Sequence, residues 1–351
     1  MIRPVVLRRL SAYRYPVNSR GSILIVVLWS LCLLSVFAVI MGYQVRQELS
    51  LVKRLDENCR GRLIAEAGVK TAIASLKKEE AKSYNSFQDA WSGFGAVNNF
   101  KDVKIGDGRF TICYNYTNEK MLVSQPLYGL IDEERKININ TSDMNTIKRL
   151  FMLVMGMDDT ESQDLAASIV DWRDADSNLS IPLGSAEDSY YKLLPYPYTA
   201  KNGPFEVIDE LLLVKGVSLG VFNRIKDFVT LYGAGRVNVN TAGRPVLEAV
   251  GISDRIASYI IDFRYGKDNM PGTADDGFFD SQANIVPRLS QSFNLSSSEV
   301  GELTAIVEKS LSVYSDNFTI KSYTKFGGAN NAIDVDCVIN RNGKILYWQE
   351  R

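Results

Sequence analysis

Residues 20–46 read RGSILIVVLWSLCLLSVFAVIMGYQVR, and this stretch decides the fold. Nineteen consecutive residues within it, Ile23–Met41, carry no charge, which is just long enough for a helix to cross a bilayer. Residues 1–21 hold five arginines and no acidic residue. Because positively charged residues stay on the cytoplasmic side, we expect one membrane span over residues 23–43, with the rest of the chain exported.

The junction between the basic leader and the apolar segment is Gly21-Ser22. An ordinary secretory signal would be cut after the apolar segment, at small residues, and Gly42–Arg46 offers no such site. A plain membrane anchor would leave the glycine unexplained. A basic leader, a glycine and then an apolar helix is the arrangement that prepilin peptidases cut on the cytoplasmic side. The pattern therefore predicts a leader over residues 1–21 and a mature chain that begins at Ser22.

The N-terminal helix is predicted to continue beyond the membrane, to residue 76. Few helix breakers follow the span, and apolar residues recur there near helical spacing: Leu49, Val52, Leu55, Leu63, Ala67 and Ile73. A long helix that is apolar in its first half and amphipathic in its second is typical of pilins. We therefore interpret residues 22–76 as a pilin-like N-terminal helix.

Strands are expected before and after a helical middle region. Residues 100–116 alternate apolar and polar side chains around Asp107-Gly108, which is a hairpin signal. Three further strands are expected at 318–326, 333–339 and 344–348. The fold class is therefore α+β, with a pilin-like long helix packed on an antiparallel sheet.

A large all-α insertion over residues 135–314 is expected to interrupt the α/β domain formed by 77–134 and 315–351. The insertion contains an internal repeat, with one copy over 137–220 and the other over 237–295. ININT in the first copy matches VNVNT in the second, LAASIVDWR matches IASYIIDFR, and an acidic loop follows each. Both copies resemble SAM-like or helix-hairpin-helix elements.

Helix-hairpin-helix elements make DNA binding the alternative function. That chemistry needs two close glycines whose amides face a phosphate, with Lys or Arg nearby. Lys215-Gly216-Val217-Ser218 and Gly251-Ile252-Ser253 each offer one glycine. Without the leader, 41 acidic residues face 35 basic ones, a net charge of about −6. We therefore expect no nucleic-acid partner and interpret the hairpins as packing elements.

The chain contains no histidine, which excludes Ser-His-Asp and Cys-His catalysis and removes the commonest zinc ligand. The four cysteines show no CxxC spacing. Cys113 and Cys337 fall on predicted strands of one domain, where a disulfide and two buried thiols are both open readings. Cys59 has no obvious mate. We expect a protein that is not an enzyme.

The first acidic loop begins Asp174-Ala-Asp176-Ser-Asn178, with oxygen side chains at alternate positions as in an EF-hand loop. Leu179 and Ser185 then depart from that template, but Glu187 and Asp188 follow within the same fifteen residues. Four carboxylates this close repel one another unless a cation or water separates them. The loop is either a cation site or a solvated acidic loop.

The second acidic loop, GKDNMPGTADDGFFD, occupies the equivalent place in the repeat and offers Asp268, Asn269, Asp275 and Asp276. Asp171 and Asp262 precede the two loops, within the helices. Two roles are open for these aspartates. They could bind a metal, or they could be structural, as a helix cap or in a salt bridge to the arginine two residues later.

The chain resembles general secretion pathway protein K, the minor pseudopilin family of the type II secretion system, essentially along its whole length and in the expected order. The resemblance lies in Gly21 followed by SILIVVLWSL, then AEAGVKTAI, GLIDEERKININT, VDWRDAD, GSAEDSYY, PFEVIDELLLVKGV and VNVNTAGRPVLEAVG. It implies a pseudopilin α/β domain with a helical insertion, cleavage by prepilin peptidase and methylation of the new N-terminus.

The resemblance also implies a location and partners. The protein would sit in the bacterial inner membrane with its bulk in the periplasm, and it would join minor pseudopilins I and J and other pseudopilins in the pseudopilus tip. Calcium in the insertion is implied as well. We assign it to Asp174, Asp176, Glu187 and Asp188 in the first loop, and to Asp268, Asn269, Asp275 and Asp276 in the second.

Val26 is the fifth residue counted from Ser22, a position where most pilin-like subunits carry Glu. That carboxylate neutralises the N-terminal amine of a neighbouring subunit within an apolar filament core, where an unpaired charge is costly. Because subunits are added at the membrane, a subunit with nothing above it needs no such Glu. Val26 therefore predicts a subunit at the tip, which initiates or caps assembly; the alternative is a monomer that stays in the membrane.

Overall fold

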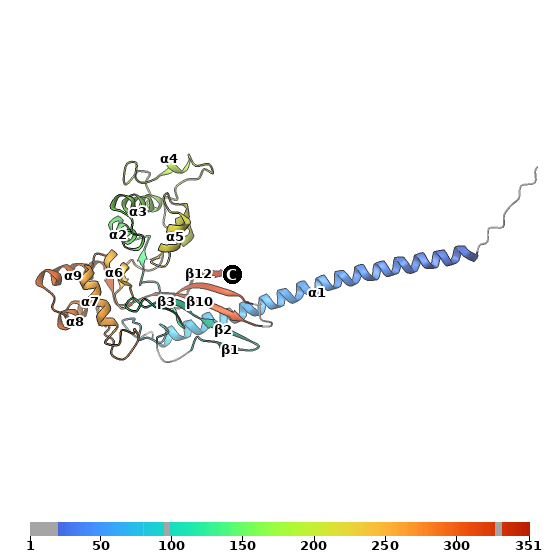
Figure 1. The fold of residues 1–351 in the computed structure, drawn as a ribbon, viewed down its shortest axis with the longest axis horizontal. Helices are drawn as coiled ribbons and strands as arrows, with labels where there is room; N and C mark the ends of the chain where they lie inside the picture. The colour runs from blue at the N-terminus through green and yellow to red at the C-terminus, as the bar shows by residue number, and fades with distance from the viewer. Residues whose placement is uncertain (1–19, 80, 95–98, 327–331) are drawn as a thin grey trace, which may run out of the picture. The chain divides into compact units, whose positions relative to one another are not determined.

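The computed structural model describes residues 20–79, 81–94, 99–326 and 332–351. Its longest element is helix α1 (Arg20–Lys78), and the chain divides into two units, Met1–Cys59 and Arg60–Arg351 (Figure 1). The described part of the first unit is the helix alone. The expected helix over 22–76 is thus confirmed, whereas most of the predicted leader lies outside the described residues.

The sheet of the second unit is antiparallel, with the strand order β1-β2-β10-β11-β12 and with β5 pairing beside β2 along β10. Its strands are β1 (Val103–Ile105), β2 (Gly108–Ile112), β5 (Ile131–Asp132), β10 (Asn317–Lys325), β11 (Asp334–Asn340) and β12 (Ile345–Glu350). The first hairpin turns at the predicted Asp107, and the sheet joins segments from both ends of the chain, as expected.

One face of this sheet packs on the C-terminal part of α1. The helix buries Ala65, Val69, Ala72 and Leu76, whose spacing of three and four places them on one side, with Ile64 next to them. They meet the strand residues Phe110, Ile112, Phe318, Ile320, Val335 and Ile339.

The helix approaches the sheet closely at Gly68. A Cβ atom there would lie 2.5 Å from the Ser322 hydroxyl and 3.2 Å from the Phe110 ring. Only glycine fits that contact without a shift of its neighbours.

A separate hairpin, β3 (Tyr114–Thr117) and β4 (Ser124–Leu127), lies between the sheet and the insertion in sequence. Tyr114, Tyr116 and Leu127 are buried in a small aromatic cluster with Phe87. The Tyr116 hydroxyl meets the Tyr265 hydroxyl of the second repeat, so the hairpin is tied to the insertion.

The insertion is mostly helical, with one large hydrophobic core. The expectation of an all-α insertion was wrong in one respect, because it also contains short parallel strand pairs, β6 with β7 and β8 with β9. Its elements are β6 (Ile137–Asn138), α2 (Met144–Met155), α3 (Asp159–Arg173), α4 (Asp188–Tyr191), η1 (Ile208–Leu213), α5 (Leu219–Ile225), β7 (Val229–Thr230), β8 (Val237–Asn238), α6 (Arg244–Ala249), α7 (Asp254–Arg264), η2 (Gln282–Asn284), α8 (Ile285–Ser292), α9 (Ser297–Ser310) and β9 (Leu311–Ser312).

The two copies of the repeat make matching hydrogen bonds through an asparagine side chain. Asn140 bonds both the N–H and the carbonyl of Phe205, at 2.8 and 3.0 Å, and Asn240 bonds both groups of Phe279, at 2.8 and 2.8 Å. The short strands themselves are held by main-chain bonds to their parallel partners, such as Ile139 N–H to Thr230 O and Val239 N–H to Ser312 O. Each asparagine side chain then ties the segment after the strand to a distant phenylalanine of the same repeat.

The arginines of the two DWR and DFR motifs also play the same structural part. Arg173 donates to the carbonyls of Ile139 and Ser142, and Arg264 donates to those of Val239 and Ala242. Each arginine thereby satisfies carbonyls in the turn that follows its short strand.

All four cysteines are free thiols. For Cys113 and Cys337 the structure therefore favours two unpaired thiols over a disulfide. Cys337 is buried in the sheet core, and burial raises the pKa of its thiol to about 12. Burial also raises the pKa of Cys113. Both side chains act as small apolar groups, because a neutral thiol is a poor nucleophile.

We predict that Asn240→Ala lowers the free energy of unfolding by about 2 kcal/mol, because the buried N–H and carbonyl of Phe279 lose their partners. Asn140→Ala should cost less, because Asn140 is only half-buried. Urea unfolding of the full chain in detergent measures both. Equal and negligible losses would show that these side chains do not hold the extended segments.

Candidate functional site

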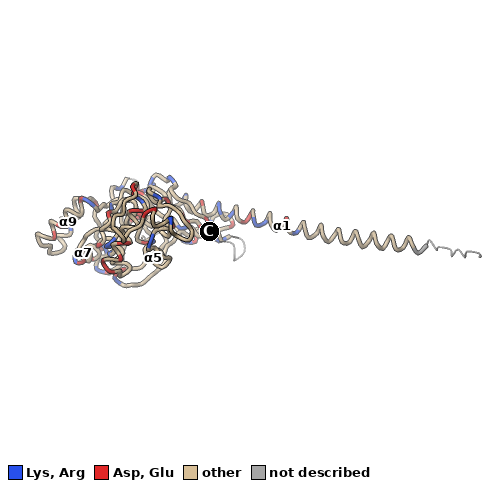
Figure 2. The backbone as a smooth tube through the Cα atoms, turned by 90° about the horizontal axis from the view of Figure 1, so that it is seen from above, with Lys and Arg blue, Asp and Glu red and all other residues tan. Residues whose placement is uncertain are grey.

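The first part of α1 is a membrane-helix candidate. By length and composition, the stretch within Ser22–Lys78 can cross a membrane, and its side chains are exposed in the structure. Figure 2 shows this part of the tube without charged residues, whereas acidic and basic residues are interspersed over the second unit.

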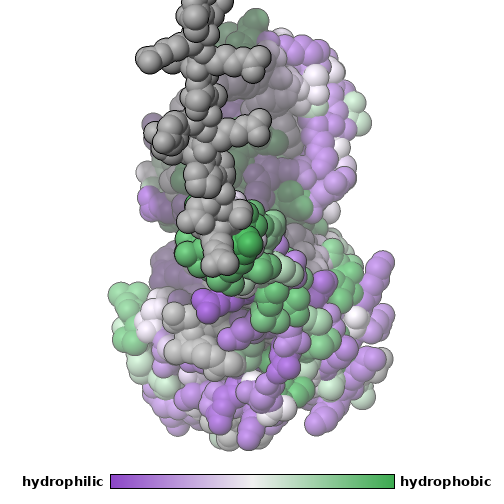
Figure 3. Space-filling model, turned by 90° about the vertical axis from the view of Figure 1, so that its right-hand side faces the viewer, coloured by the Kyte–Doolittle hydropathy of each residue, from purple (hydrophilic) through white to green (hydrophobic). Residues whose placement is uncertain are grey.

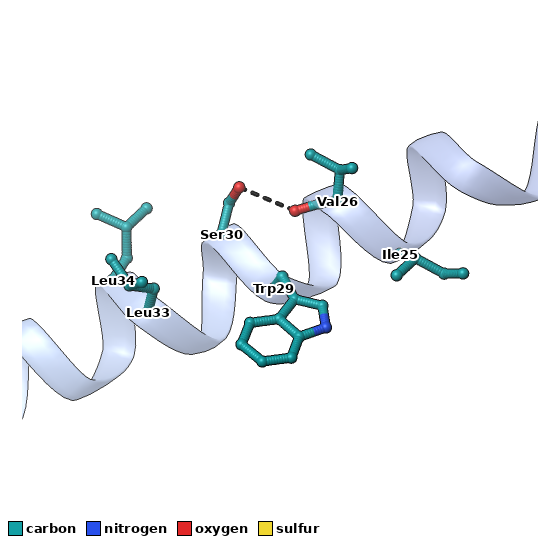
Figure 4. A pocket seen from close by; sticks show the side chains of 6 residues that line it. All are labelled: Ile25, Val26, Trp29, Ser30, Leu33 and Leu34. Carbon is teal, nitrogen blue, oxygen red and sulfur yellow. Dashed lines mark hydrogen bonds between the residues drawn. The ribbon is translucent and has the colours of Figure 1, made fainter.

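Gly21 and Ser22, the predicted cleavage point, lie in the first turn of α1. Val26 is 60% exposed on the helix surface, and its carbonyl accepts a 2.8 Å hydrogen bond from the Ser30 hydroxyl (Figure 4). Trp29 projects from another side of the helix in that view. Within the described residues 22–41 the helix carries no ionisable group of Asp, Glu, Lys or Arg, so position 26 offers no counter-charge to an amine.

The first acidic loop follows α3 and brings three carboxylates toward one another. Asp171 and Glu187 are buried, with 0% and 2% of their surface exposed, and Asp174 is half-buried. Burial and then the charges of Asp171 and Asp174 raise the pKa of Glu187 to about 7. Burial, Asp176 and Asp171 likewise raise the pKa of Asp174.

The same loop leaves carboxylate oxygens without partners. No described residue donates a hydrogen bond to either side-chain oxygen of Glu187 or to the buried Oδ1 of Asp174. A buried, unpaired carboxylate is costly unless a cation meets it. An oxygen-rich cluster of this kind fits calcium, which takes six to eight oxygen ligands.

The other two residues predicted for this loop have partners of their own. Asp188 accepts from Lys192 Nζ at 2.7 Å and from the Ala200 N–H at 2.9 Å, and these bonds lower its pKa. Asp176 is exposed and accepts from the Asn178 N–H at 2.7 Å. The structure therefore groups Asp174 and Glu187 with Asp171, and it draws Asp188 into a separate set of bonds.

Asp171 is the residue that sequence analysis left open. The proposed salt bridge to Arg173 does not form, because that guanidinium binds main-chain carbonyls instead. The Asp171 carboxylate accepts from the Ser180 N–H, at 3.1 and 3.2 Å to its two oxygens, and so turns toward the loop. The sequence does place Asp171 three residues before the loop begins at Asp174. That position alone does not reveal whether its side chain points toward the loop.

The second acidic loop is more compact. Asp268, Asp275 and Asp276 bring carboxylate oxygens within 4.8 Å of one another. Most of these oxygens are already bonded: Asp276 accepts from the N–H groups of Gly272 and Thr273, and Asp275 accepts from the Lys267 N–H and the Thr273 hydroxyl. The short distances between its oxygens favour the second loop as a metal site, whereas buried oxygens without partners favour the first loop. We give more weight to the unpaired buried oxygens of the first loop, because exposed acids that already accept hydrogen bonds need no ion.

Asn269 stands apart from this cluster and meets a lysine. Lys120, from the turn of the β3–β4 hairpin, lies 2.8 Å from Asn269 Oδ1 and 2.6 Å from Asp262 Oδ1. Asp262 is the counterpart of Asp171. Of the readings left open for it, a salt bridge does form, but with Lys120 and not with Arg264. In the second repeat, Asp262 thus has the ammonium group of Lys120 beside it. In the first repeat, its counterpart Asp171 faces carboxylate oxygens that have no partner among the described residues.

A long apolar N-terminal helix whose C-terminal part packs on an antiparallel sheet defines the pilin-like class of membrane-anchored proteins. The family model described as type II secretion system (T2SS), protein K, matches residues 122–234. The resemblance found in the sequence is therefore confirmed over this part of the chain, which is similar to the protein K family.

Three curated relatives carry the description type II secretion system protein K. The one from Pseudomonas aeruginosa is 36% identical over 39% of this chain and 40% of its own length. The one from Aeromonas hydrophila is 26% identical over 63% and 66%, and the one from Pectobacterium carotovorum is 29% identical over 36% and 40%. Each match spans less than two thirds of the relative's length.

A solved structure shares the fold. It is a chain in the crystal structure of the GspK-GspI-GspJ complex from the type 2 secretion system of enterotoxigenic Escherichia coli. The two chains superpose with a TM-score of 0.61 over 87% of this chain and 99% of that one, at 17% sequence identity. At that identity the likeness concerns the fold.

For protein kept free of divalent cations, we predict that stability falls as the pH rises from about 4.5 to about 7. The folded state holds the Glu187 proton with a pKa of about 7 against an ordinary 4.5, so it binds more protons than the unfolded state in that window. Glu187→Gln should make the fall less steep when it is measured by urea unfolding in chelator, and the buried Glu134, whose pKa is also raised, should account for part of the fall that remains.

Asp188→Asn is the matched control for that experiment. The Asp188 pKa is lowered, so its contribution is present at neutral pH and is lost only as the pH falls into the acid range. A wild-type profile that does not change between pH 4.5 and 7 would contradict the burial of a charged Glu187.

Proposed function

We propose that this chain is a minor pseudopilin at the tip of a type II secretion pseudopilus, where it initiates or caps assembly and supports the export of folded proteins across the outer membrane. The observation that carries the proposal is the combination of a pilin-like helix and sheet with a large insertion. The match of the protein K family model across the first repeat supports it.

The insertion favours the tip over the shaft on steric grounds. Residues 135–314 make up more than half of the chain that follows the membrane segment. Such a mass would obstruct regular stacking of subunits along a filament, whereas a terminal subunit can carry it. Val26 supports the same position, because a Glu there would be a buried carboxylate with no subunit above to pair with it.

The membrane topology belongs to the same proposal. Prepilin peptidase would cut between Gly21 and Ser22, and α1 would remain in the inner membrane with its N-terminus toward the cytoplasm until the subunit is assembled. The partners would be the minor pseudopilins I and J, as in the complex whose chain shares this fold. The proposal assigns no catalytic role to any residue.

The hairpin of the first repeat argues against the DNA-binding alternative. Lys215 Nζ donates to the carbonyl oxygens of Leu183, Gly184 and Ser185, at 3.4, 2.8 and 3.2 Å. Arg224 donates to the Val154 carbonyl at 2.9 Å. Both basic groups of the motif therefore hold the insertion together, and a phosphate would have to displace those bonds.

Calcium in the first loop is part of the proposal. Asp171, Asp174 and Glu187 would hold the ion, with Asp176 at the exposed side, and the ion would neutralise carboxylates that otherwise lie buried and unpaired. The second loop, with Asp268, Asp275 and Asp276, is the weaker candidate because its oxygens already accept hydrogen bonds.

For the tip position, we predict a mature chain that begins at Ser22 and is present at about one copy per filament, because each filament has one end without a subunit above it. N-terminal sequencing and site-specific labelling of sheared pseudopili measure both quantities. Label at regular intervals along the shaft would reject the tip position, and complete absence from filaments would favour a membrane-resident monomer.

For calcium, we predict that a chelator lowers the thermal midpoint of the full chain and that added calcium restores it. An ion at about 100 times its Kd would contribute about 2.7 kcal/mol to the folded state. Glu187→Gln should remove most of the effect, whereas Asp276→Asn should leave it nearly intact. An unchanged melting curve together with no metal by elemental analysis would show that the loop is merely acidic.

A further inference from the structure

The sheet ends in an edge strand with unpaired main-chain groups. β12 pairs with β11 on one side, and among the described residues no strand pairs with its other side. Arg351 and Asp334 exchange two hydrogen bonds, at 2.9 and 3.1 Å. Because bonded and non-bonded pairs alternate along an antiparallel ladder, the N–H and carbonyl groups of Trp348 and Glu350 point away from β11.

This edge has fewer of the devices that keep sheet edges from pairing than the opposite edge has, since its irregularity and its one charge lie at the two ends of the strand. The opposite edge strand, β1, has three residues with Lys104 at its centre. β12 has six residues, and the first five, Ile-Leu-Tyr-Trp-Gln, carry no charge and no proline. A short strand with a lysine resists strand addition, whereas a longer uncharged edge invites it. Ile345 and Leu346 are also 48% and 39% exposed, so this strand presents two large apolar side chains to solvent.

β12 is held in place by contacts on both faces, so its edge is a fixed template. The half-buried Trp348 packs on the core between the sheet and α1, and its Nε1–H donates to Glu350 at 2.8 Å. Glu350 in turn lies 3.0 Å from Arg62 of α1.

The other face of the strand lines a cleft. Tyr347 and Gln349 form one wall of a cavity of about 260 Å³ between the sheet and the first repeat. The irregularity in pairing falls near Leu346, at the start of the strand, so Tyr347 to Glu350 remain regular. The four residues that would receive a partner are thus fixed before it arrives.

We propose that β12 receives an extended, uncharged strand from a neighbouring minor pseudopilin, which continues the sheet past Trp348 and Glu350. Among protein ligands, an extended strand matches main-chain groups at two-residue spacing, which identifies the chemistry of the occupant. Its side chains would lie beside Leu346, Tyr347 and Trp348, where a charged group would be desolvated without a partner. This inference rests on the proposed function, because it takes the strand from a subunit of the same filament.

The sharpest test compares two variants at one position. Glu350→Pro removes the outward N–H but no hydrogen bond to β11, since proline is tolerated on edge strands where the N–H faces solvent. Glu350→Ala removes the same carboxylate, with its contacts to Arg62 and Trp348, and keeps the N–H. The full chain is co-purified in detergent with minor pseudopilins I and J, and its affinity for them is measured.

We expect the alanine variant to bind like the wild type and the proline variant to bind about tenfold more weakly, because a hydrogen bond is lost and the pyrrolidine ring meets the incoming strand. Ile105→Lys on β1 should have no effect, whereas Leu346→Lys on β12 should weaken binding. Equal affinity of the proline and alanine variants would overturn the proposal.

Hydrogen exchange gives a second readout that does not depend on a variant's fold. In the wild-type chain alone, the amides of Trp348 and Glu350 should exchange quickly, and in the complex they should be protected at least tenfold, an order-of-magnitude expectation for a newly bonded strand. Co-purification without this protection would overturn strand addition and leave the proposed function standing. Failure of the chain to associate with either pseudopilin would overturn both.

Discussion

The carboxylate of Asp132 holds the insertion on the sheet, and the arrangement of the second unit depends on it. It is 1% exposed and accepts hydrogen bonds from Asn238, Thr241 and Ser315. These donors come from the start of the second repeat and from the segment that returns to the sheet. Three segments far apart in sequence therefore meet at one buried charge, which is costly to bury unless every oxygen is satisfied.

The two residues that follow extend this junction. Glu133 bonds Thr230, Thr319 and Lys136, and Glu134 bonds both nitrogen groups of Asn317. The sheet and the end of the first repeat are thus joined by polar contacts instead of a shared hydrophobic core, and the hydrophobic clusters on either side remain separate. On the outer face that Figure 3 shows, hydrophilic residues predominate and hydrophobic residues form smaller groups.

The sequence was sufficient for features that depend on local periodicity. The helix, the Asp107-Gly108 hairpin, the C-terminal strands and the repeated motifs all follow from residue spacing. It was insufficient where a distant segment decides. Nothing near Asp262 indicates that Lys120, 142 positions earlier, would bind it, and nothing near Asp188 indicates that Lys192 and Ala200 would occupy its oxygens. The short parallel strands were also missed, because each is only two residues long and pairs with a segment more than 70 residues away.

The close approach at Gly68 has a mechanical consequence. Two glycines, Gly61 and Gly68, let the helix lie against Phe326, Ser322 and Phe110 with no room for a methyl group. A rotation of the helix about its axis would bring a side chain such as Leu63 into the same gap and would clash there, which opposes rolling of the helix on the sheet. Residues 60–78 are therefore coupled to the sheet, and a force along this part of the helix would be passed to the strands.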